Sequence, residues 1–351
     1  MIIAALSLCS LMLAAPPLTV AERLTLAEGY VGRGDGKKAQ PLLEAVLADA
    51  AIDDATRAKA SRALGLALIQ QKKAADAVAP LVQATTLRPH DEKGWLYLGV
   101  ARDQAGDVAG ALLAYEAGAK AVPSSTSLAH EYGMGLLQAG RVAEAAAILD
   151  AAATKSEHDP ELAADASYAL SLAGKFKPAR EFALRAVEQG PENPNALYAL
   201  GMAELGLGNN KAATQAFVDA VDSDPMHLPA LFQLGLLQQT GGDHVAAAKT
   251  LTQVLKIEPE HARARAALGL SLLAVGDDSK AEPLLRAATM AEPKLASAWR
   301  GLGELLARSG RIAEAKKALQ TAYSLKPTAQ LKARLDGLAG VAEGTPSRDP
   351  P

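Results

Sequence analysis

The sequence predicts an all-α protein built from helical hairpins that repeat along the chain. The stretch from Pro194 to Pro225 holds two amphipathic helical patterns joined at a Gly-Asn-Asn turn that begins at Gly208. The same pattern recurs up and down the 351-residue chain at a spacing of 34 residues. A repeat of fixed period indicates an elongated stack of similar units rather than several globular domains.

Each repeat is predicted to hold two helices with fixed ends. Counting Pro194 as position 1, small or apolar residues fall at positions 4, 7, 8 and 11 of the first helix and at positions 20, 24 and 27 of the second. These are Leu197, Leu200, Gly201 and the departure Glu204, then Ala213, Phe217 and Ala220. Gly208 ends the first helix, because glycine readily adopts the left-handed cap conformation, and Pro225 closes the second. Small residues at positions 8 and 20 let the helices approach closely.

Nine such repeats are predicted to occupy residues 22–327. They start near Val20, Ala58, Glu92, Thr126, Pro160, Pro194, Leu228, Ala262 and Ala296. The first is four residues longer than the others, so its loop around Asp53 and Asp54 should differ. Lys72 stands where the second repeat should have its inter-helix glycine, and Ser167 replaces a small Gly or Ala in the fifth. Three prolines fall within second helices, where we expect late helix starts or local kinks: Pro41, Pro80 and Pro283.

The pattern resembles the tetratricopeptide repeat (TPR) family. The residues that carry the resemblance are Trp95, Leu98, Gly99, Ala111, Tyr115 and Pro123 in the third repeat, and Trp299, Leu302, Gly303, Ala315, Leu319, Ala322 and Pro327 in the ninth. The resemblance implies a right-handed superhelical solenoid, with first helices on the concave surface and second helices on the convex one. After the ninth repeat, an amphipathic segment within residues 328–339 is predicted to be a capping helix, because a solenoid's last repeat leaves an apolar face uncovered.

The two ends of the chain carry further signals. An uncharged apolar run from Ile2 to Ala15 suits a secretory signal peptide over residues 1–21, with cleavage between Ala21 and Glu22. No Lys or Arg precedes this run. Two alternatives are an apolar first helix of a cytoplasmic protein and a lipoprotein acylated at Cys9. Residues 340–351 are rich in Gly, Pro, Ser and charge, so a disordered tail is predicted there.

Composition excludes several classes of function. Hydrophobic residues make up 49% of the chain but aromatic residues only 4%, which suits closely packed helices rich in Ala and Leu. The formal net charge of -3 gives no overall attraction to nucleic acid, and we predict no nucleic-acid partner. Cys9 is the only cysteine, so an internal disulfide is impossible.

The resemblance also implies a binding groove. In the family, positions 2, 5, 9, 12 and 13 of the first helix commonly face the concave surface. In this sequence they give an apolar and aromatic middle comprising His130, Met134, Tyr168, Tyr198, Met202, Phe232, Leu236 and Leu270. Basic residues stand toward the two ends, namely Lys59, Arg62 and Lys93 on one side and Arg263, Arg300 and Arg308, with Glu304 among them, on the other.

We interpret the apolar residues as the lining of a trough for an extended or helical peptide, with basic ends that could pair with acidic groups. The alternative is that tight packing buries the aromatic side chains between neighbouring first helices, while the basic residues are simply solvated.

No catalytic motif, cofactor-binding site or metal site is predicted. His90, His158, His227 and His261 recur at repeat ends, but equivalent positions in successive repeats lie too far apart to share a metal ion. We interpret these histidines as solvated loop residues. The repeats fill the chain between its ends, so we predict that the protein is not an enzyme.

The predicted function is that of an exported scaffold, periplasmic or attached to the bacterial envelope, which binds a protein or peptide of unknown identity in its groove. No small-molecule substrate is inferred. Two alternatives are a structural spacer or self-associating assembly subunit, and a non-catalytic repeat subunit of an enzyme complex.

Overall fold

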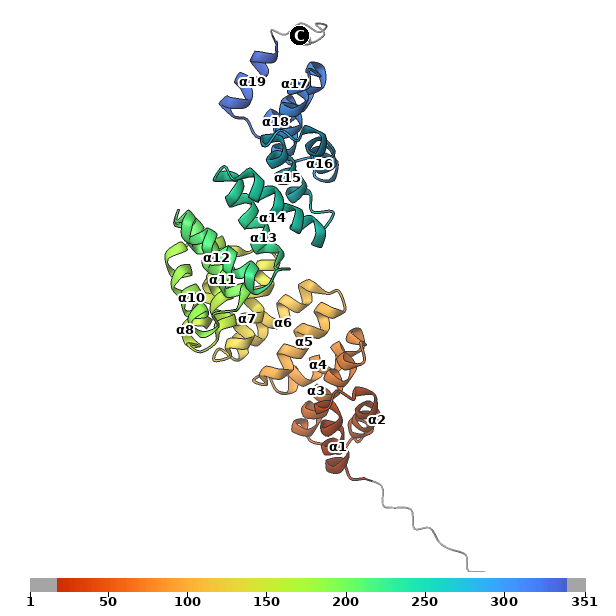
Figure 1. Cartoon of the computed structure of the whole chain (residues 1–351). Helices are drawn as coiled ribbons and strands as arrows, with labels where there is room; N and C mark the ends of the chain where they lie inside the picture. Colours follow the sequence, from red (N-terminus) through yellow and green to blue (C-terminus); the bar gives the residue numbers. More distant parts are fainter. Residues whose placement is uncertain (1–17, 340–351) are drawn as a thin grey trace, which may run out of the picture. The chain divides into compact units, whose positions relative to one another are not determined.

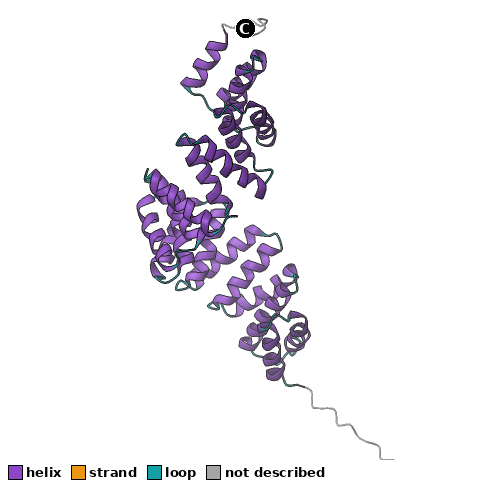
Figure 2. Cartoon of the chain, in the orientation of Figure 1, coloured by secondary structure: helices purple, strands orange, loops and turns teal. Residues whose placement is uncertain are grey.

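The computed structural model of the chain describes residues 18–339, and the regular structure within this range is entirely helical (Figure 2). Residues 1–17 and 340–351, which include most of the predicted signal peptide and all of the predicted tail, lie outside it. The chain divides between Ser156 and Glu157 into two compact units, labelled by helix in Figure 1. Each unit is a series of helical hairpins, with odd-numbered first helices and even-numbered second helices.

The first unit contains four hairpins. Its helices are α1 (Val20–Gly32), α2 (Gly36–Leu47), α3 (Asp54–Gln70), α4 (Ala74–Leu87), α5 (Glu92–Gln104), α6 (Val108–Ala121), α7 (Thr126–Gln138) and α8 (Val142–Lys155). Helix α3 is longer than the other first helices because the four extra residues of the first repeat form its first turn. Asp53 caps that turn by accepting a hydrogen bond from the Thr56 amide, 2.7 Å away. The extra residues thus extend the helix rather than the loop.

The second unit contains five hairpins and a terminal helix. Its helices are α9 (Pro160–Leu172), α10 (Phe176–Gln189), α11 (Pro194–Gly206), α12 (Asn210–Ser223), α13 (Leu228–Thr240), α14 (His244–Ile257), α15 (Ala262–Ala274), α16 (Asp278–Ala291), α17 (Ala296–Arg308), α18 (Ile312–Leu325) and α19 (Ala329–Ala339). The described helices therefore form an all-α arrangement of nine repeats and a cap, as the sequence predicts.

Each first helix ends in the same hydrogen-bonded turn. In the sixth repeat Gly208 has a φ of +81°, and the Asn209 amide donates to the Glu204 carbonyl at 2.9 Å. Glycines take the same left-handed conformation at seven other turns, namely Gly34, Gly106, Gly140, Gly174, Gly242, Gly276 and Gly310. Lys72, with a φ of +61°, occupies the remaining one. The glycine spacing in the sequence is thus the spacing of these helix ends.

Close approach of the two helices in a hairpin depends on position 8. A Cβ atom on Gly201 would lie 2.5 Å from the Phe217 ring, and one on Gly133 would lie 2.5 Å from Leu149. In these two hairpins a glycine at position 8 faces a large residue at position 24. The fifth repeat has a larger residue at position 8 and a smaller one at position 24. There Ser167 on α9 and Ala183 on α10, at positions 8 and 24, are both fully buried. The larger residue at position 8 is accommodated by a smaller one at position 24.

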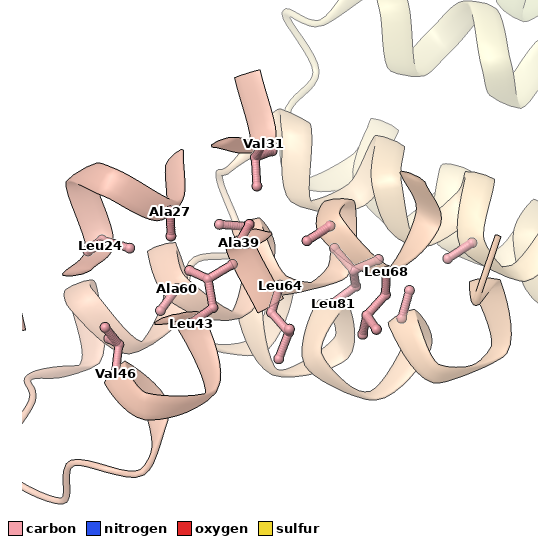
Figure 3. Packing of buried hydrophobic residues seen from close by; sticks show 14 of the residues in the cluster. Leu24, Ala27, Val31, Ala39, Leu43, Val46, Ala60, Leu64, Leu68 and Leu81 are labelled. Atoms are coloured by element: carbon pink, nitrogen blue, oxygen red, sulfur yellow. The ribbon is translucent and has the colours of Figure 1, made fainter. Parts of the chain in front are cut away.

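Buried apolar side chains run along the hairpin interfaces of each unit. Figure 3 shows this packing in the first unit, where Ala27 of α1, Leu43 of α2 and Leu64 of α3 belong to one cluster. In the second unit, Leu331 and Leu338 of α19 join a cluster to which α15, α16, α17 and α18 also contribute. The terminal helix therefore covers apolar surface of the last repeat, which is the role predicted for a cap.

The expectation of late helix starts at prolines is wrong. Pro41, Pro80 and Pro283 lie inside α2, α4 and α16, and these helices begin as early as those that lack proline. Pro41 and Pro283 are the sixth residues of their helices and Pro80 is the seventh, so the carbonyl that loses its hydrogen bond lies in the first turn. Pro41 and Pro283 are also exposed, so water can bond to that carbonyl.

The first described helix begins at Val20, just before the predicted cleavage point between Ala21 and Glu22. Thr19 is the N-cap of α1 and forms a capping box with Glu22. The Thr19 amide donates to the Glu22 carboxylate at 2.8 Å, and the Glu22 amide donates to the Thr19 hydroxyl oxygen at 3.3 Å. Ala21 and Glu22 therefore lie in the first turn of α1. None of the helices formed by residues 18–339 is long and apolar enough to cross a bilayer.

Candidate peptide-binding groove

The predicted groove residues of the second unit lie on four successive first helices. Tyr168 belongs to α9, Tyr198 and Met202 to α11, Phe232 and Leu236 to α13, and Leu270 to α15; all six are half-buried. All six occupy position 5 or 9, which lie next to position 8, the position that faces the second helix. In the first unit, His130 and Met134 occupy the same two positions on α7 and are half-buried as well.

Tyr198 is the centre of an aromatic cluster. Its ring centroid lies 5.9 Å from that of Tyr168 on the preceding first helix, 5.4 Å from His227 at the start of the following one, and 5.8 Å from Phe217 of its own hairpin. These separations and tilted ring planes are typical of favourable aromatic contacts. Tyr198 thus contacts its neighbours on both sides along the stack.

The surroundings of Tyr198 keep its hydroxyl neutral. Burial raises the pKa of the Tyr198 hydroxyl to about 12, with a further contribution from Tyr168, while a hydrogen bond with Gln233 acts in the opposite direction. A tyrosine hydroxyl is uncharged at neutral pH in any case, and the raised pKa keeps Tyr198 in this hydrogen-bonding form to higher pH.

The other apolar groove residues also contact the core. Met202 packs against the cluster of Leu197, Phe217 and Leu234, and Leu236 packs against the cluster around Leu251. The Phe232 ring lies 4.8 Å from that of His261. Each half-buried side chain thus has one side in the core and another at the surface, so packing between first helices and lining of a surface coexist at the same residues.

Most of the basic residues at the predicted groove ends are already paired. Toward one end, the distance between nitrogen and carboxylate oxygen is 2.8 Å for Lys59 and Glu28 and 2.6 Å for Arg62 and Asp91. Toward the other end, it is 3.6 Å for Arg263 and Glu292, 3.2 Å for Arg300 and Glu304, and 2.9 Å for Arg308 and Asp278. Lys93 is exposed and forms no ion pair with any described residue. Acidic groups of a ligand would have to share or displace these partners. The pair of Arg62 and Asp91 is the least exposed of the five, and exposed pairs such as the other four are each worth about 0–1 kcal/mol.

Two of the repeat-end histidines have a structural role, which corrects their interpretation as solvated loop residues. His227 is 9% exposed, and its Nδ1 accepts a hydrogen bond from the Ala230 amide at the start of α13. His261 caps α15 in the same way through the Ala264 amide. Burial lowers the pKa of His227, which favours the neutral ring that this acceptor role requires. His90 and His158 are exposed.

Glu204, a departure from the apolar pattern, anchors a polar network that sequence reasoning missed. It is 5% exposed and accepts hydrogen bonds from Arg180 Nε of α10 at 2.6 Å and from Asn209 Nδ2 at 2.7 Å. Burial raises the pKa of this carboxyl, but the bonds from Asn209 and Arg180 outweigh that effect and lower it. The signal in the sequence was the acidic residue itself at an inward position.

The described part of the chain contains no group of three or more His, Cys, Asp or Glu side chains placed to hold a metal ion. No catalytic domain is evident among the described repeats.

Stacked helical hairpins with glycine turns every 34 residues define a helical-repeat protein. Sequence models described as tetratricopeptide repeat match residues 24–92, 173–227, 240–302 and 296–328. The chain belongs to the tetratricopeptide repeat family. Proteins of this family are scaffolds that mediate binding to other proteins or peptides and are generally not catalytic.

Solved structures share the fold at low sequence identity. The Cut9–Hcn1 heterotetramer of APC/C matches with 12% identity and a TM-score of 0.61, over 91% of this chain and 76% of that one. A tetratricopeptide repeat protein from Parabacteroides merdae ATCC 43184 matches with 15% identity and a TM-score of 0.52, over 71% of this chain and 99% of that one. YrrB, described as a TPR protein with an unusual peptide-binding site, matches with 20% identity and a TM-score of 0.46, over 54% of this chain and 97% of that one. No curated protein sequence matches significantly.

Proposed function

We propose that this chain is an interaction scaffold that binds a segment of a partner protein along its first helices. The observation that carries the proposal is the row of half-buried aromatic and apolar side chains at positions 5 and 9 of α9, α11, α13 and α15. Aromatic residues and Met at the surface supply the large contact area typical of binding hot spots. Because their inner sides are held in the core, little ordering cost is added when a ligand binds.

The location of this activity is part of the proposal. The apolar run of residues 2–15, with small residues before Glu22, supports export and action in the envelope or in secretory assembly. A reporter enzyme that is active only after export, fused behind residues 1–40, tests this. We expect activity that disappears when residues 2–15 are deleted. Unchanged export without that run contradicts the location.

Site-specific photo-crosslinking in the native host tests the binding surface. A benzoylphenylalanine placed at Phe232 or Tyr198 keeps an aromatic ring at the position, and its added benzoyl group has space only on the surface side of these half-buried residues, so circular dichroism must check that each variant remains helical. The matched controls are Gln215 on α12 and Lys249 on α14, which are exposed on second helices of the same unit. We expect a dominant crosslinked protein from the first-helix positions only.

Strong crosslinks from Gln215 or Lys249 with none from Phe232 or Tyr198 would move the binding surface to the second helices. That result would contradict binding in the groove but would still agree with a scaffold function.

A second candidate is self-association through second helices and repeat ends. Three apolar side chains of the second unit are well exposed, with Met226 at 68%, Val245 at 72% and Met290 at 81%. Exposed apolar side chains favour association if they lie close enough to form a patch. Light scattering across a hundredfold range of concentration tests this candidate, because a mass that stays at that of the monomer contradicts it.

A further inference from the structure

A cleft at the end of the second unit has a lining that differs from the apolar groove. It lies between α17 and α19 and has a volume of about 710 Å³. Its walls are Arg300, Glu304 and Arg308 of α17, then Gln330, Leu331, Ala333 and Arg334 of α19. Arg300, Glu304 and Arg308 are spaced four residues apart, so they line one face of α17. The volume is in the range of sites that enclose a small ligand or a few side chains.

The charge of this cleft is positive. Three guanidinium groups face a single carboxylate, that of Glu304. Arg334 is exposed and forms no ion pair with any residue in the described part of the chain. Arg300 bonds to Glu304 through Nη1, and Arg308 bonds through Nη1 to Asp278 and to the Leu273 carbonyl, 2.9 and 3.1 Å away. These bonds leave other N–H groups of both guanidiniums for a ligand.

The arginines are also held in position. Arg308 is fixed by two partners on the preceding repeat, and Arg300 by its neighbour one turn along α17. The side chain of Leu331, which is buried, and the exposed methyl group of Ala333 contribute apolar surface to the lining of the cleft. Planar guanidinium groups held beside apolar surface favour carboxylates, which they bind through paired hydrogen bonds.

Two features favour carboxylates over phosphate or nucleic acid. Glu304 in the wall repels a doubly charged phosphate group more than a singly charged carboxylate. The lining contains no aromatic side chain on which a base could stack, and the chain as a whole carries a net charge of -3.

We propose that the cleft between α17 and α19 binds the side-chain carboxylates of an acidic segment of a partner protein. The inference rests on the proposed scaffold function and specifies the chemistry of one partner segment. The capping helix then has a second role, because it supplies Arg334 and Gln330 to the site as well as covering the last repeat.

The probe for this proposal is a fluorescein-labelled hexaglutamate peptide, with hexaglutamine as its uncharged counterpart. Binding to the full chain is followed by fluorescence anisotropy at low salt and again at 0.5 M NaCl. We expect saturable binding of hexaglutamate and at least about tenfold weaker binding of hexaglutamine, with the difference reduced at high salt because exposed charges are screened.

A charge-matched pair of variants locates the site. The test variant combines Arg300→Gln and Arg334→Gln. The control combines Lys316→Gln and Lys317→Gln, two lysines that line a separate pocket on another side of α19 together with Leu335 and Asp336. Both variants lose two positive charges. We expect about tenfold weaker binding of hexaglutamate in the test variant and less than twofold weakening in the control, and circular dichroism checks that both remain helical.

Equal weakening by the two variants would overturn the proposal, because it would show attraction to charge in general. The single variant Arg334→Gln keeps the test decisive if the double variant is poorly folded, since Arg334 is exposed; it should weaken binding at least threefold, and an unchanged affinity overturns the site. Preferential binding of a phosphoserine hexapeptide would overturn the choice of carboxylate.

These results are separable from those on the groove. A partner that crosslinks at Phe232 but binds the arginine variant normally contradicts only this inference. Binding of hexaglutamate in the cleft without any crosslink at Phe232 or Tyr198 contradicts only the apolar groove.

Discussion

Lys72 is the single non-glycine residue with a positive φ among residues 18–339. It occupies the turn between α3 and α4, where every other hairpin has glycine. A side chain in the left-handed conformation carries a steric cost of about 1–2 kcal/mol, partly offset by the smaller entropy that lysine loses on folding.

The substitution Lys72→Gly should therefore raise the free energy of unfolding by about 1 kcal/mol. The control is Lys211→Gly, at an exposed helical position in the first turn of α12, where glycine relieves no left-handed strain and should be destabilising. Urea titrations of both variants measure the difference. Equal effects of the two changes would show that the left-handed turn is not the cause.

Glu282 is a residue whose stabilising effect should depend on pH. Its carboxylate accepts hydrogen bonds from Arg286 Nε at 2.8 Å and from Arg311 Nη1 and Nη2 at 2.8 and 2.6 Å. The bonds from Arg311 are the main cause that lowers the pKa of Glu282 to about 2, against the effect of burial and with help from Arg286. The folded state thus holds the charged form more strongly than the unfolded chain does.

Glu282→Gln should lower the free energy of unfolding by about 1 kcal/mol at pH 7, the magnitude for a partly exposed network. Since the pKa is depressed in the folded state, this stabilisation is complete above the ordinary value of 4.5 and is lost as the pH falls toward 2. The difference between wild type and variant should therefore shrink below pH 4.5, measured by urea titration. Glu181→Gln, at an exposed position on α10, should show no such change.

The close packing of α11 against α12 can be tested by substituting Gly201, the residue at position 8 of this hairpin. Gly201→Ala places a Cβ against the Phe217 ring and should destabilise by about 1–3 kcal/mol. In a Phe217→Ala background the clash is gone, so the same change should cost much less, and a double-mutant cycle measures the coupling. Ser167→Ala is the control, because its hydroxyl is buried without a hydrogen bond and a small residue faces it. Additive costs at Gly201 and Phe217 would contradict this fit.

At the scale of elements, the sequence predicts what is periodic and misses what is particular to one repeat. Glycine turns, small residues at position 8 and closing prolines recur in most repeats, so helix number and helix ends could be predicted. Pro41 was misleading because a proline near a helix start loses only one hydrogen bond. His227 as a cap and Glu204 as a buried carboxylate depend on single partners in space, and no period reveals them.

The candidate site was less predictable than the fold for the same reason. The family pattern indicates which positions lie on the first-helix surface, but not how far Tyr198 or Phe232 sinks between neighbours. It also places Arg300 and Arg308 on that surface without revealing that α19 completes a cleft beside them. That cleft requires the cap to be placed in space, which the 34-residue period does not describe.

At the scale of the whole molecule, the division at Ser156 and Glu157 predicts where the chain can be cut. Residues 18–156 and 157–351, produced separately, should each be helical and unfold cooperatively, because each unit contains its own hydrophobic clusters. A cut at Gly174 separates α9 from α10 and exposes the cluster of Ala163 and Ala186, so its fragments should be less helical or aggregate. Circular dichroism and thermal melts compare the two cuts. Equal stability of both fragment pairs would contradict the division.

The hairpins also have a consequence for synthesis on the ribosome. Among residues 18–339, every helix pair in substantial contact joins consecutive helices or alternate first helices, so none of these helices waits for a partner far along the chain. Contacts between near neighbours in sequence form quickly, because little chain entropy is lost in closing them. Each hairpin can thus pack as soon as the next helix emerges, well before translation ends. Little apolar surface is then exposed to chaperones at any moment, and α19, the last of the described helices to be translated, covers the open face of the ninth repeat.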